Sequence, residues 1–144
     1  MKRQAFSLIS LLSLLLLAGS AIAQTVRVRA NVPFNFTVGN KTLPAGMYSI
    51  RTIGDRGMTT LLVQAQDGHS SIMTNSNAAE NLKPADKSKL VFNRYRDQYF
   101  LSEIWVAGVS RGHRLPKTSR EKELARDLAQ DLTQRRVEIV ASLY

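Results

Sequence analysis

The chain has no cysteine among its 144 residues, which excludes disulfide bonds and chemistry that needs a thiolate. Histidine is scarce as well: His69 follows an Asp-Gly turn, and His113 lies in an arginine-rich stretch. A metal centre needs three or four ligands at compact spacing, and Asp67 with His69 supplies only a pair. We therefore expect no metal and no cofactor, and we interpret both histidines as solvated loop residues rather than catalytic bases.

The sequence also lacks a Gly-x-Ser-x-Gly nucleophile elbow, a glycine-rich phosphate loop and any internal repeat. Among the carboxylates of the extended region, only Glu103 lies inside an expected strand, between Leu101 and Trp105. A glycosidase needs a second carboxylate across a cleft, and no spacing supplies one. We therefore expect no enzymatic activity and interpret Glu103 as the partner of a neighbouring basic residue such as Arg94. A carbohydrate- or lipid-handling hydrolase that uses Glu103 near Trp105 stays as the alternative.

Long apolar runs are absent except at the N-terminus. Lys2 and Arg3 precede an apolar run over residues 5–18, and Ala21 and Ala23 stand at the two positions that a signal peptidase reads. This is the pattern of a secretory signal peptide over residues 1–23, with cleavage expected between Ala23 and Gln24. The run is shorter than the about 20 apolar residues of a spanning helix, so an uncleaved anchor is the weaker alternative. We expect a bacterial protein that is exported to the periplasm or the medium.

Acidic residues are few: 11 aspartates and glutamates face 20 lysines and arginines, which gives a formal charge of +9. Export argues against nucleic acid as the partner, and the anions outside the membrane are lipids, polysaccharides and wall polymers. Alternate residues of a strand point the same way, so several arginines could line one face of a sheet; they are Arg27, Arg29, Arg51, Arg94 and Arg96. We expect an anionic envelope polymer, a glycan or another envelope protein as partner, with membrane contact only through an uncleaved signal segment. An ordinary solvated face is the alternative.

Apolar residues alternate over residues 25–38, which predicts strand with one face buried. Pro33 divides this stretch into strands at 25–32 and 34–38. Further strands are expected at residues 47–53, 59–66 and 70–75, separated by Gly- and Asp-rich turns that include Gly54 to Gly57. Residues 77–87 are expected to form a loop. The sequence therefore predicts a mainly β domain over residues 24–108, a small antiparallel sandwich or flattened barrel of about seven strands.

Residues 89–106 are the most apolar part after the N-terminus and predict a central hairpin with strands at about 90–95 and 99–106. A three-residue loop would place one set of side chains on one face: Leu90, Phe92, Phe100, Ile104 and Val106. The other face would then carry Val91, Tyr95, Tyr99, Leu101 and Trp105. A two-residue loop would exchange members of these sets, because one residue of slip turns a side chain to the opposite face. Tyr95, Tyr99 and Trp105 could form an exposed platform for sugar rings, with Arg94 and Glu103 at its rim, or they could be covered.

Residues 109–144 begin with a loop and change to a helical pattern after Pro116. Thr118 with Glu121 three residues later is a capping box, and Leu124, Leu128 and Leu132 recur every fourth residue. We predict an amphipathic helix at about 119–135 that docks on the aromatic face of the central hairpin, because a lone helix of this length is marginal in water. Residues 137–144 alternate and favour a last strand, with an extended helix as the alternative.

The stretch Leu43-Pro44-Ala45-Gly46-Met47-Tyr48-Ser49-Ile50 resembles the L-P-x-G-x-Y-x-V/I turn and strand of bacterial surface β-sandwich modules. Three longer stretches resemble a family of small exported bacterial proteins of unknown function: VRANVPFNFTVGNKTLPAGMYSI, LVFNRYRDQYFLSEIW and LPKTSREKELA. Where that family carries glycine, this chain has Arg96, which affects the hairpin turn. The resemblance implies export and a β-rich fold and supplies no site. Our prediction is an exported, non-catalytic binding or structural protein of the cell envelope or the extracellular space, and a glycan-binding module is a further alternative.

Overall fold

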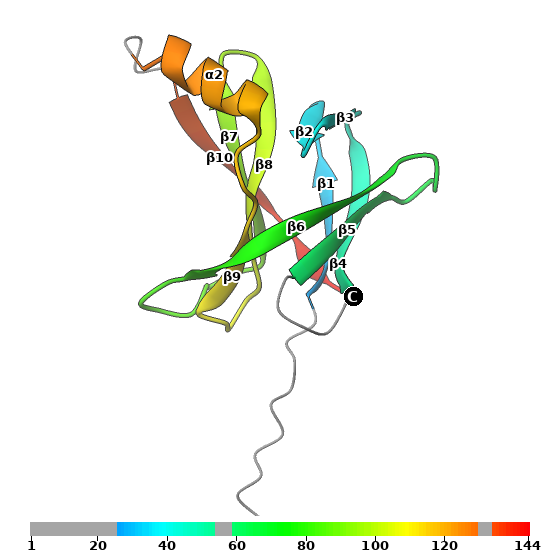
Figure 1. Ribbon diagram of the computed structural model, residues 1–144. Helices are drawn as coiled ribbons and strands as arrows, with labels where there is room; N and C mark the ends of the chain where they lie inside the picture. The colour runs from blue at the N-terminus through cyan, green and yellow to red at the C-terminus, as the bar shows by residue number, and fades with distance from the viewer. Residues whose placement is uncertain (1–25, 54–58, 130–133) are drawn as a thin grey trace, which may run out of the picture.

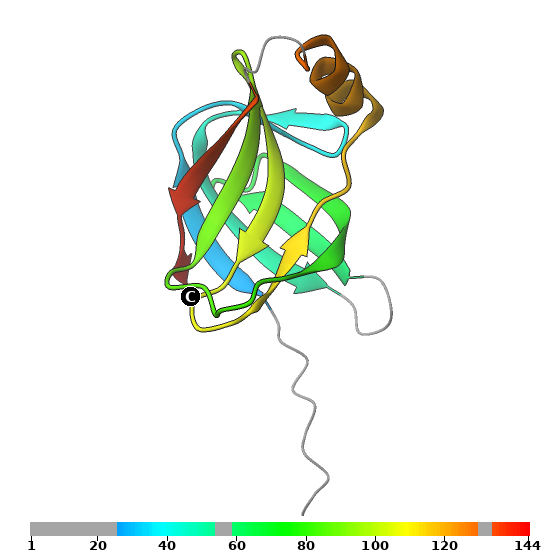
Figure 2. The same cartoon turned by 90° about the vertical axis from the view of Figure 1, so that its left-hand side faces the viewer.

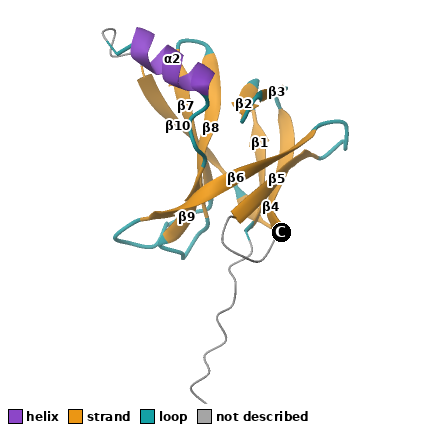
Figure 3. Ribbon diagram, viewed as in Figure 1, coloured by secondary structure: helices purple, strands orange, loops and turns teal. Residues whose placement is uncertain are grey.

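The computed structural model describes residues 26–53, 59–129 and 134–144 of the chain. The expected signal peptide with its cleavage point at Ala23 and Gln24, the turn from Gly54 to Gly57, and Leu132 lie outside the described residues. The described part is mainly β with one helix, as predicted (Figure 3). That helix is too short and too polar to cross a membrane.

The strands belong to one hydrogen-bonded sheet, which is open rather than a closed barrel. They are β1 (Arg27–Val32), β2 (Phe36–Val38), β3 (Lys41–Leu43), β4 (Gly46–Ile53), β5 (Thr59–Ala65), β6 (Ser71–Glu80), β7 (Lys89–Tyr95), β8 (Gln98–Trp105), β9 (Arg111–Arg114), β10 (Gln134–Val140) and β11 (Ser142–Leu143). Along the sheet they run β10-β7-β8-β9-β6-β5-β4-β1-β11, and the β2–β3 hairpin attaches to β8. In Figure 1 the β7, β8 and β10 part diverges from the β1, β4 and β5 part, and β6 runs across both.

Our estimate of about seven strands was too low, because β3, β9 and β11 are only 3, 4 and 2 residues long. Alternation cannot be recognised over so few residues. Residues 77–80, which we expected in a loop, continue β6 because they pair with β9 from Asn77↔Arg114 to Glu80↔Arg111. Residues 109–144 contribute β9, β10 and β11 to the same sheet.

The period-two pattern of the first strand is confirmed. Residues of β1 alternate strictly between exposed and buried, and Val28 and Val32 are fully buried. They pack against Ile50 of β4 and Val63 of β5 in the main core. Aromatic side chains fill the space between the two parts of the sheet, since the Phe36 ring meets the rings of both Tyr48 and Phe92 edge-on at centroid distances of 5.0 and 5.4 Å. The main core thus lies between the β1–β4–β5 part and the β7–β8 part.

The β7–β8 hairpin has the two-residue turn, in which Tyr95 pairs with Gln98 and Arg96 adopts a φ of 56°. With this shorter turn, Tyr99 and Leu101 face the main core and Phe100 faces the outer side, beneath α2. A three-residue loop would have placed each of them on the other face. A bulge then restores the parity, because Glu103 pairs with Val91 while Leu101 pairs with Phe92, which leaves Ser102 as the extra residue. Ile104 and Trp105 consequently face the sides that the longer loop would have given them.

The helix α2 (Ser119–Asp127) is shorter than the 119–135 that we predicted, but its start and its docking agree with the prediction. Thr118 is the N-cap, and its hydroxyl accepts a hydrogen bond from the Glu121 backbone N–H at 3.2 Å. Leu124 and Leu128 pack on Tyr95 and Phe100 of the β7–β8 outer face. The residues after the helix return to the sheet as β10, antiparallel to β7, so the strand interpretation of the C-terminus is confirmed and begins at Gln134.

The two ends of the sheet are successive parts of one C-terminal segment. β10 pairs with β7 from Gln134↔Tyr95 to Val140↔Lys89, and β11 pairs with β1 through Val28↔Leu143 and Arg29↔Ser142. Between them, the Ala141 N–H donates to the Ser88 carbonyl at 2.9 Å, and the Ala141 side chain is buried in the main core. Figure 2 shows this segment descending beside β7 to the C-terminus.

Candidate functional site

Glu103 is buried on the outer face of β8, where three donors surround its carboxylate. Trp105 Nε1–H donates to Oε2 at 2.9 Å, Arg136 Nη2 donates to Oε2 at 2.8 Å, and Arg114 Nε donates to Oε1 at 3.1 Å. Only 4% of Glu103 is exposed. Burial alone would raise the pKa of this carboxyl, but the hydrogen bond from Trp105 and the charges and hydrogen bonds of Arg136 and Arg114 outweigh it and lower the pKa. Glu103 is therefore held as a carboxylate and tied to three neighbouring side chains.

The partners of Glu103 differ from the one suggested by sequence. Arg94 does not reach the carboxylate: its Nε donates to the Arg96 carbonyl at 2.6 Å, and its guanidinium lies 5.4 Å from the centre of the Tyr99 ring. Arg114 pairs with Glu103 across the β8–β9 ladder, and Arg136 reaches it from β10, which lies on the far side of β7. These two arginines are distant in sequence from Glu103, so only the strand order brings them together.

Of the two alternatives for Tyr95, Tyr99 and Trp105, an exposed platform or coverage, the structure does not show the exposed platform. Tyr95 is fully buried under α2, and Trp105 is buried in a separate small cluster with Ala79 and Val91. Tyr99 lies on the opposite face of the hairpin, where its ring stacks on Phe34 at a centroid distance of 3.8 Å. The three rings thus belong to three different packing environments, and the β7–β8 bulge and turn are the reason.

A second buried carboxylate, which sequence reasoning assigned only to the capping box, lies beneath α2. Glu121 is 4% exposed, and its Oε1 accepts hydrogen bonds from Asn93 Nδ2 at 2.9 Å and from the Tyr95 hydroxyl at 3.2 Å. Burial, followed by the charge and the hydrogen bond of Glu121, raises the pKa of Tyr95 to about 12. The network joins the first turn of the helix to β7. The sequence signal that could have revealed it is Asn93, a polar residue between two buried apolar positions of a strand.

His69 is a solvated loop residue as we expected, but the same interpretation of His113 was wrong, because His113 lies in β9 and is half-buried. His69 is exposed, and its imidazole is 3.6 Å from Asp67 in the β5–β6 turn. His113 Nδ1 lies 3.1 Å from the Ser76 hydroxyl, which in turn donates to the Thr59 carbonyl at 3.2 Å. Burial lowers the pKa of His113. Because the Ser76 proton is directed to a backbone carbonyl, the Ser76–His113 contact joins β6 to β9 and does not activate a nucleophile. Within the described ranges, no three histidine and carboxylate side chains are grouped as metal ligands.

Three exposed arginines share the outer face of the β1–β4 pair. Arg27 is directly opposite Arg51, and Arg29 follows two residues along β1 on the same face. The Arg29 guanidinium also lies 4.7 Å from the centre of the Tyr144 ring. We call Arg27, Arg29 and Arg51 the arginine face. The other two arginines proposed for it, Arg94 and Arg96, are on the β7–β8 hairpin and do not join it.

The arginine face has no local counter-charge in the part of the chain that the structure describes. None of its three guanidinium groups lies within 4.0 Å of a described carboxylate. The strands β1, β4, β5 and β11 contain no aspartate or glutamate. Like charges directly opposite each other in a ladder destabilise it, so the Arg27–Arg51 pair carries a cost that a bound anion would remove. The arginine face is thus a basic surface built on paired strands of the sheet.

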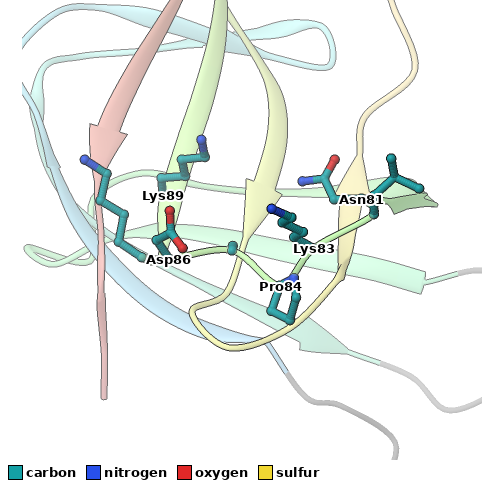
Figure 4. A pocket seen from close by; sticks show the side chains of 8 residues that line it. Asn81, Lys83, Pro84, Asp86 and Lys89 are labelled. Atoms are coloured by element: carbon teal, nitrogen blue, oxygen red, sulfur yellow. The ribbon is translucent and has the colours of Figure 1, made fainter.

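One hollow follows the connection between β6 and β7 and measures about 520 Å³. Figure 4 shows Lys83, Asp86 and Lys89 along this connection, and Leu82 also lines it. Lys89 Nζ forms an ion pair with Glu138 Oε1 at 2.7 Å. A second hollow of about 220 Å³ lies against the Leu-Pro-Ala-Gly turn, where the Tyr48 hydroxyl donates to the Pro44 carbonyl at 2.7 Å. Neither hollow contains Glu103, Glu121 or His113.

Comparisons with protein-family models, with curated proteins and with solved structures find no match for this chain. The function therefore has to be argued from its own residues.

Proposed function

We propose that this chain is an exported, non-catalytic binding protein of the bacterial envelope or its surroundings, and that it binds an anionic polymer on the arginine face. Export is inferred from the N-terminal pattern that ends at Ala23 and Gln24. The observation that carries the binding proposal is the direct pairing of Arg27 with Arg51, with Arg29 beside them and no described carboxylate to neutralise them.

The geometry of the arginine face supports a multivalent anion. Residues two apart on a strand are separated by about 7 Å, and directly paired residues have Cβ atoms about 5 Å apart. The three guanidinium groups therefore start from backbone positions close enough to meet neighbouring charges of one polymer segment. Guanidinium groups bind carboxylate and phosphate oxygens in a bidentate manner, which favours these groups on the ligand. The partner class is thus a polycarboxylate or polyphosphate chain.

The non-catalytic part of the proposal is supported by the state of the carboxylates near the aromatic residues. A general acid in a glycosidase needs a raised pKa and an open approach to its substrate. Glu103 has a lowered pKa and lies buried with three donors around it. Glu121 is equally buried and is bound by Asn93 and Tyr95. Both arrangements are those of side chains that hold strands and helix together.

The proposal is tested by measuring binding of the exported protein to linear polyphosphate and to polygalacturonate, with neutral dextran as the reference polymer. We expect binding to both polyanions that weakens with added salt, and no binding to dextran. Replacement of all three arginines, Arg27→Gln with Arg29→Gln and Arg51→Gln, should weaken polyanion binding by about 10- to 100-fold, since exposed ion pairs contribute up to about 1 kcal/mol each.

A matched control removes the same charge elsewhere. Lys117, Lys122 and Arg126 are exposed residues in and before α2, and their joint change to glutamine should leave binding within about twofold of the unsubstituted protein. If both triple variants weaken binding equally, the effect is one of net charge, and the arginine face is not the site. Turnover of a glycoside or ester substrate by the exported protein would refute the non-catalytic assignment.

A further inference from the structure

We propose that the end of the molecule formed by the β6–β7 connection, the C-terminal segment and the start of β1 docks on an anionic lipid surface. This goes beyond polyanion binding on the arginine face. It also differs from the membrane contact that the sequence suggested, which involved only an uncleaved signal segment. We call this region the lower end, from its place in Figures 1 and 2, where both views show these three segments at the bottom of the molecule.

The first observation is where exposed apolar side chains gather. Six large apolar residues are exposed in the described part of the chain, and four of them belong to the segments of the lower end. Leu82 in the β6–β7 connection is fully exposed, and the exposed fractions of Val140, Leu143 and Tyr144 are 60%, 58% and 50%. Single exposed apolar residues are common on protein surfaces, but a concentration at one end of a domain marks an interaction site.

The sheet register places the exposed residues of the C-terminal segment beside β7 and β1. Val140 pairs with Lys89, the first residue of β7 after the connection, and the Ala141 N–H donates to the Ser88 carbonyl at 2.9 Å. Leu143 pairs with Val28, one residue from Arg27. The C-terminal segment thus runs from the end of the β6–β7 connection to the beginning of β1, and its exposed side chains follow that path.

The β6–β7 connection is held in place, so Leu82 projects from a fixed frame. Asn81 N–H donates to the Ser110 carbonyl at 2.8 Å, and Ala85 N–H donates to the Val109 carbonyl at 3.0 Å. The Gly108 N–H donates a hydrogen bond to the Ala85 carbonyl at 2.8 Å. Because these bonds fix both sides of Leu82, its exposure to water is a property of the fold. A leucine presented in this way can enter a lipid interface without the entropic cost of ordering the loop.

The charges of the lower end complement an anionic membrane. Exposed Lys83 and Lys87 flank the hollow beside Leu82 and face one acidic side chain of the same connection, Asp86. Lys89 is paired with Glu138. Apolar side chains surrounded by an excess of basic ones are the combination by which peripheral proteins bind anionic lipid, each lysine near the surface contributing about fivefold in affinity.

The test measures partition of the exported protein to vesicles of phosphatidylcholine mixed with phosphatidylglycerol, and to vesicles of phosphatidylcholine alone. We expect stronger binding to the anionic vesicles. The variant Leu82→Ser with Val140→Thr should bind the anionic vesicles about tenfold less tightly, because it removes apolar groups from the interface. The variant Lys83→Gln with Lys87→Gln should lose about 25-fold. All variants keep the same N-terminus, so any contribution of the first residues is common to them.

The matched control is Met73→Ser. Met73 is 65% exposed on the outer face of β6, opposite Leu62 and outside the three segments of the lower end, so its change should leave partition within about twofold. Equal partition to both kinds of vesicle, full binding by the Leu82→Ser, Val140→Thr variant, or equal losses with Met73→Ser would each overturn the proposal. The same variants assayed on polyphosphate separate the two sites: the Leu82→Ser, Val140→Thr change should leave polyanion binding unchanged, and failure of polyanion binding would refute only the arginine face.

Discussion

Replacement of Glu103 by glutamine should destabilise the protein in a way that depends on pH. Glutamine has nearly the same shape as glutamate and keeps one acceptor oxygen. Its NH₂ group takes the place of the second carboxylate oxygen and therefore faces the donors that this oxygen binds in the unsubstituted protein. The carboxylate accepts from Trp105 Nε1 and Arg136 on one oxygen and from Arg114 on the other. The substitution therefore removes the charge from both arginine contacts and leaves at least one donor facing another donor.

The size of the expected loss of stability follows from the solvent exposure of the two arginines that bind Glu103. The side chains of Arg114 and Arg136 are 59% and 57% exposed, so each ion pair is screened and contributes about 0.5–1 kcal/mol. A donor left without an acceptor at the buried Glu103 adds about 1–2 kcal/mol. We expect Glu103→Gln to lower the free energy of unfolding by about 2–4 kcal/mol at neutral pH. For a domain of this size that lowers Tm by roughly 6–16 °C.

The pH dependence gives the sharper test. The pKa of Glu103 is lowered below its ordinary value of 4.5, so its contribution to stability is complete above that value and is lost as the pH falls through the lower pKa of the folded state. Glutamine resembles the protonated side chain, so urea denaturation should show a large difference between the two proteins at neutral pH and a small one in acid. An equal difference at both pH values would refute this reasoning. Increased stability of the variant would instead be typical of a strained catalytic residue.

Three further changes test other parts of the packing by thermal and urea denaturation. Gly112→Ala would place a Cβ 2.6 Å from the Trp105 ring and 2.8 Å from a backbone oxygen, so it should cost about 3 kcal/mol, and an unchanged Tm would contradict that packing. Leu128→Ala should cost about 2 kcal/mol by uncovering Tyr95, and no loss would show that α2 is not docked. The raised Tyr95 pKa predicts falling stability between about pH 10 and 12, where the unfolded state ionises first. This fall should be smaller in Tyr95→Phe, in which only Tyr48 keeps a pKa raised by burial.

The long alternating stretches were predictable because burial repeats every second residue. In β1, Arg27 and Arg29 are exposed and Val28 and Val32 are buried, as their chemistry requires. The start of α2 was equally clear, since Thr118 caps the helix as its position before Glu121 predicts. Both patterns are local in the sequence, so they can be recognised without knowing which strands pair.

The hairpin faces and the site partners could not be obtained from local signals. The extra residue Ser102 in β8 shifts the register by one, and nothing in its neighbourhood distinguishes it from a regular strand residue. Glu103 meets Arg114 and Arg136 only because β9 and β10 flank the β7–β8 pair, an order set by long-range pairing. The pairing of Arg27 with Arg51 likewise depends on the β1–β4 register, although the shared parity of Arg27 and Arg29 was visible in the sequence.

The pairing of Leu143 with Val28 also fixes an order of events during folding. The first strand cannot gain its second neighbour until residues 142–143 have been synthesised, and its outer edge stays available to other chains until then. The C-terminal segment therefore acts as a latch, by which we mean that it covers two strand edges. Its strand β11 covers the outer edge of β1, and its strand β10 covers the outer edge of β7 at the opposite end of the sheet. A nascent or truncated chain that lacks the latch would expose two strand edges at once, which makes the last few residues a safeguard against association of unfinished molecules.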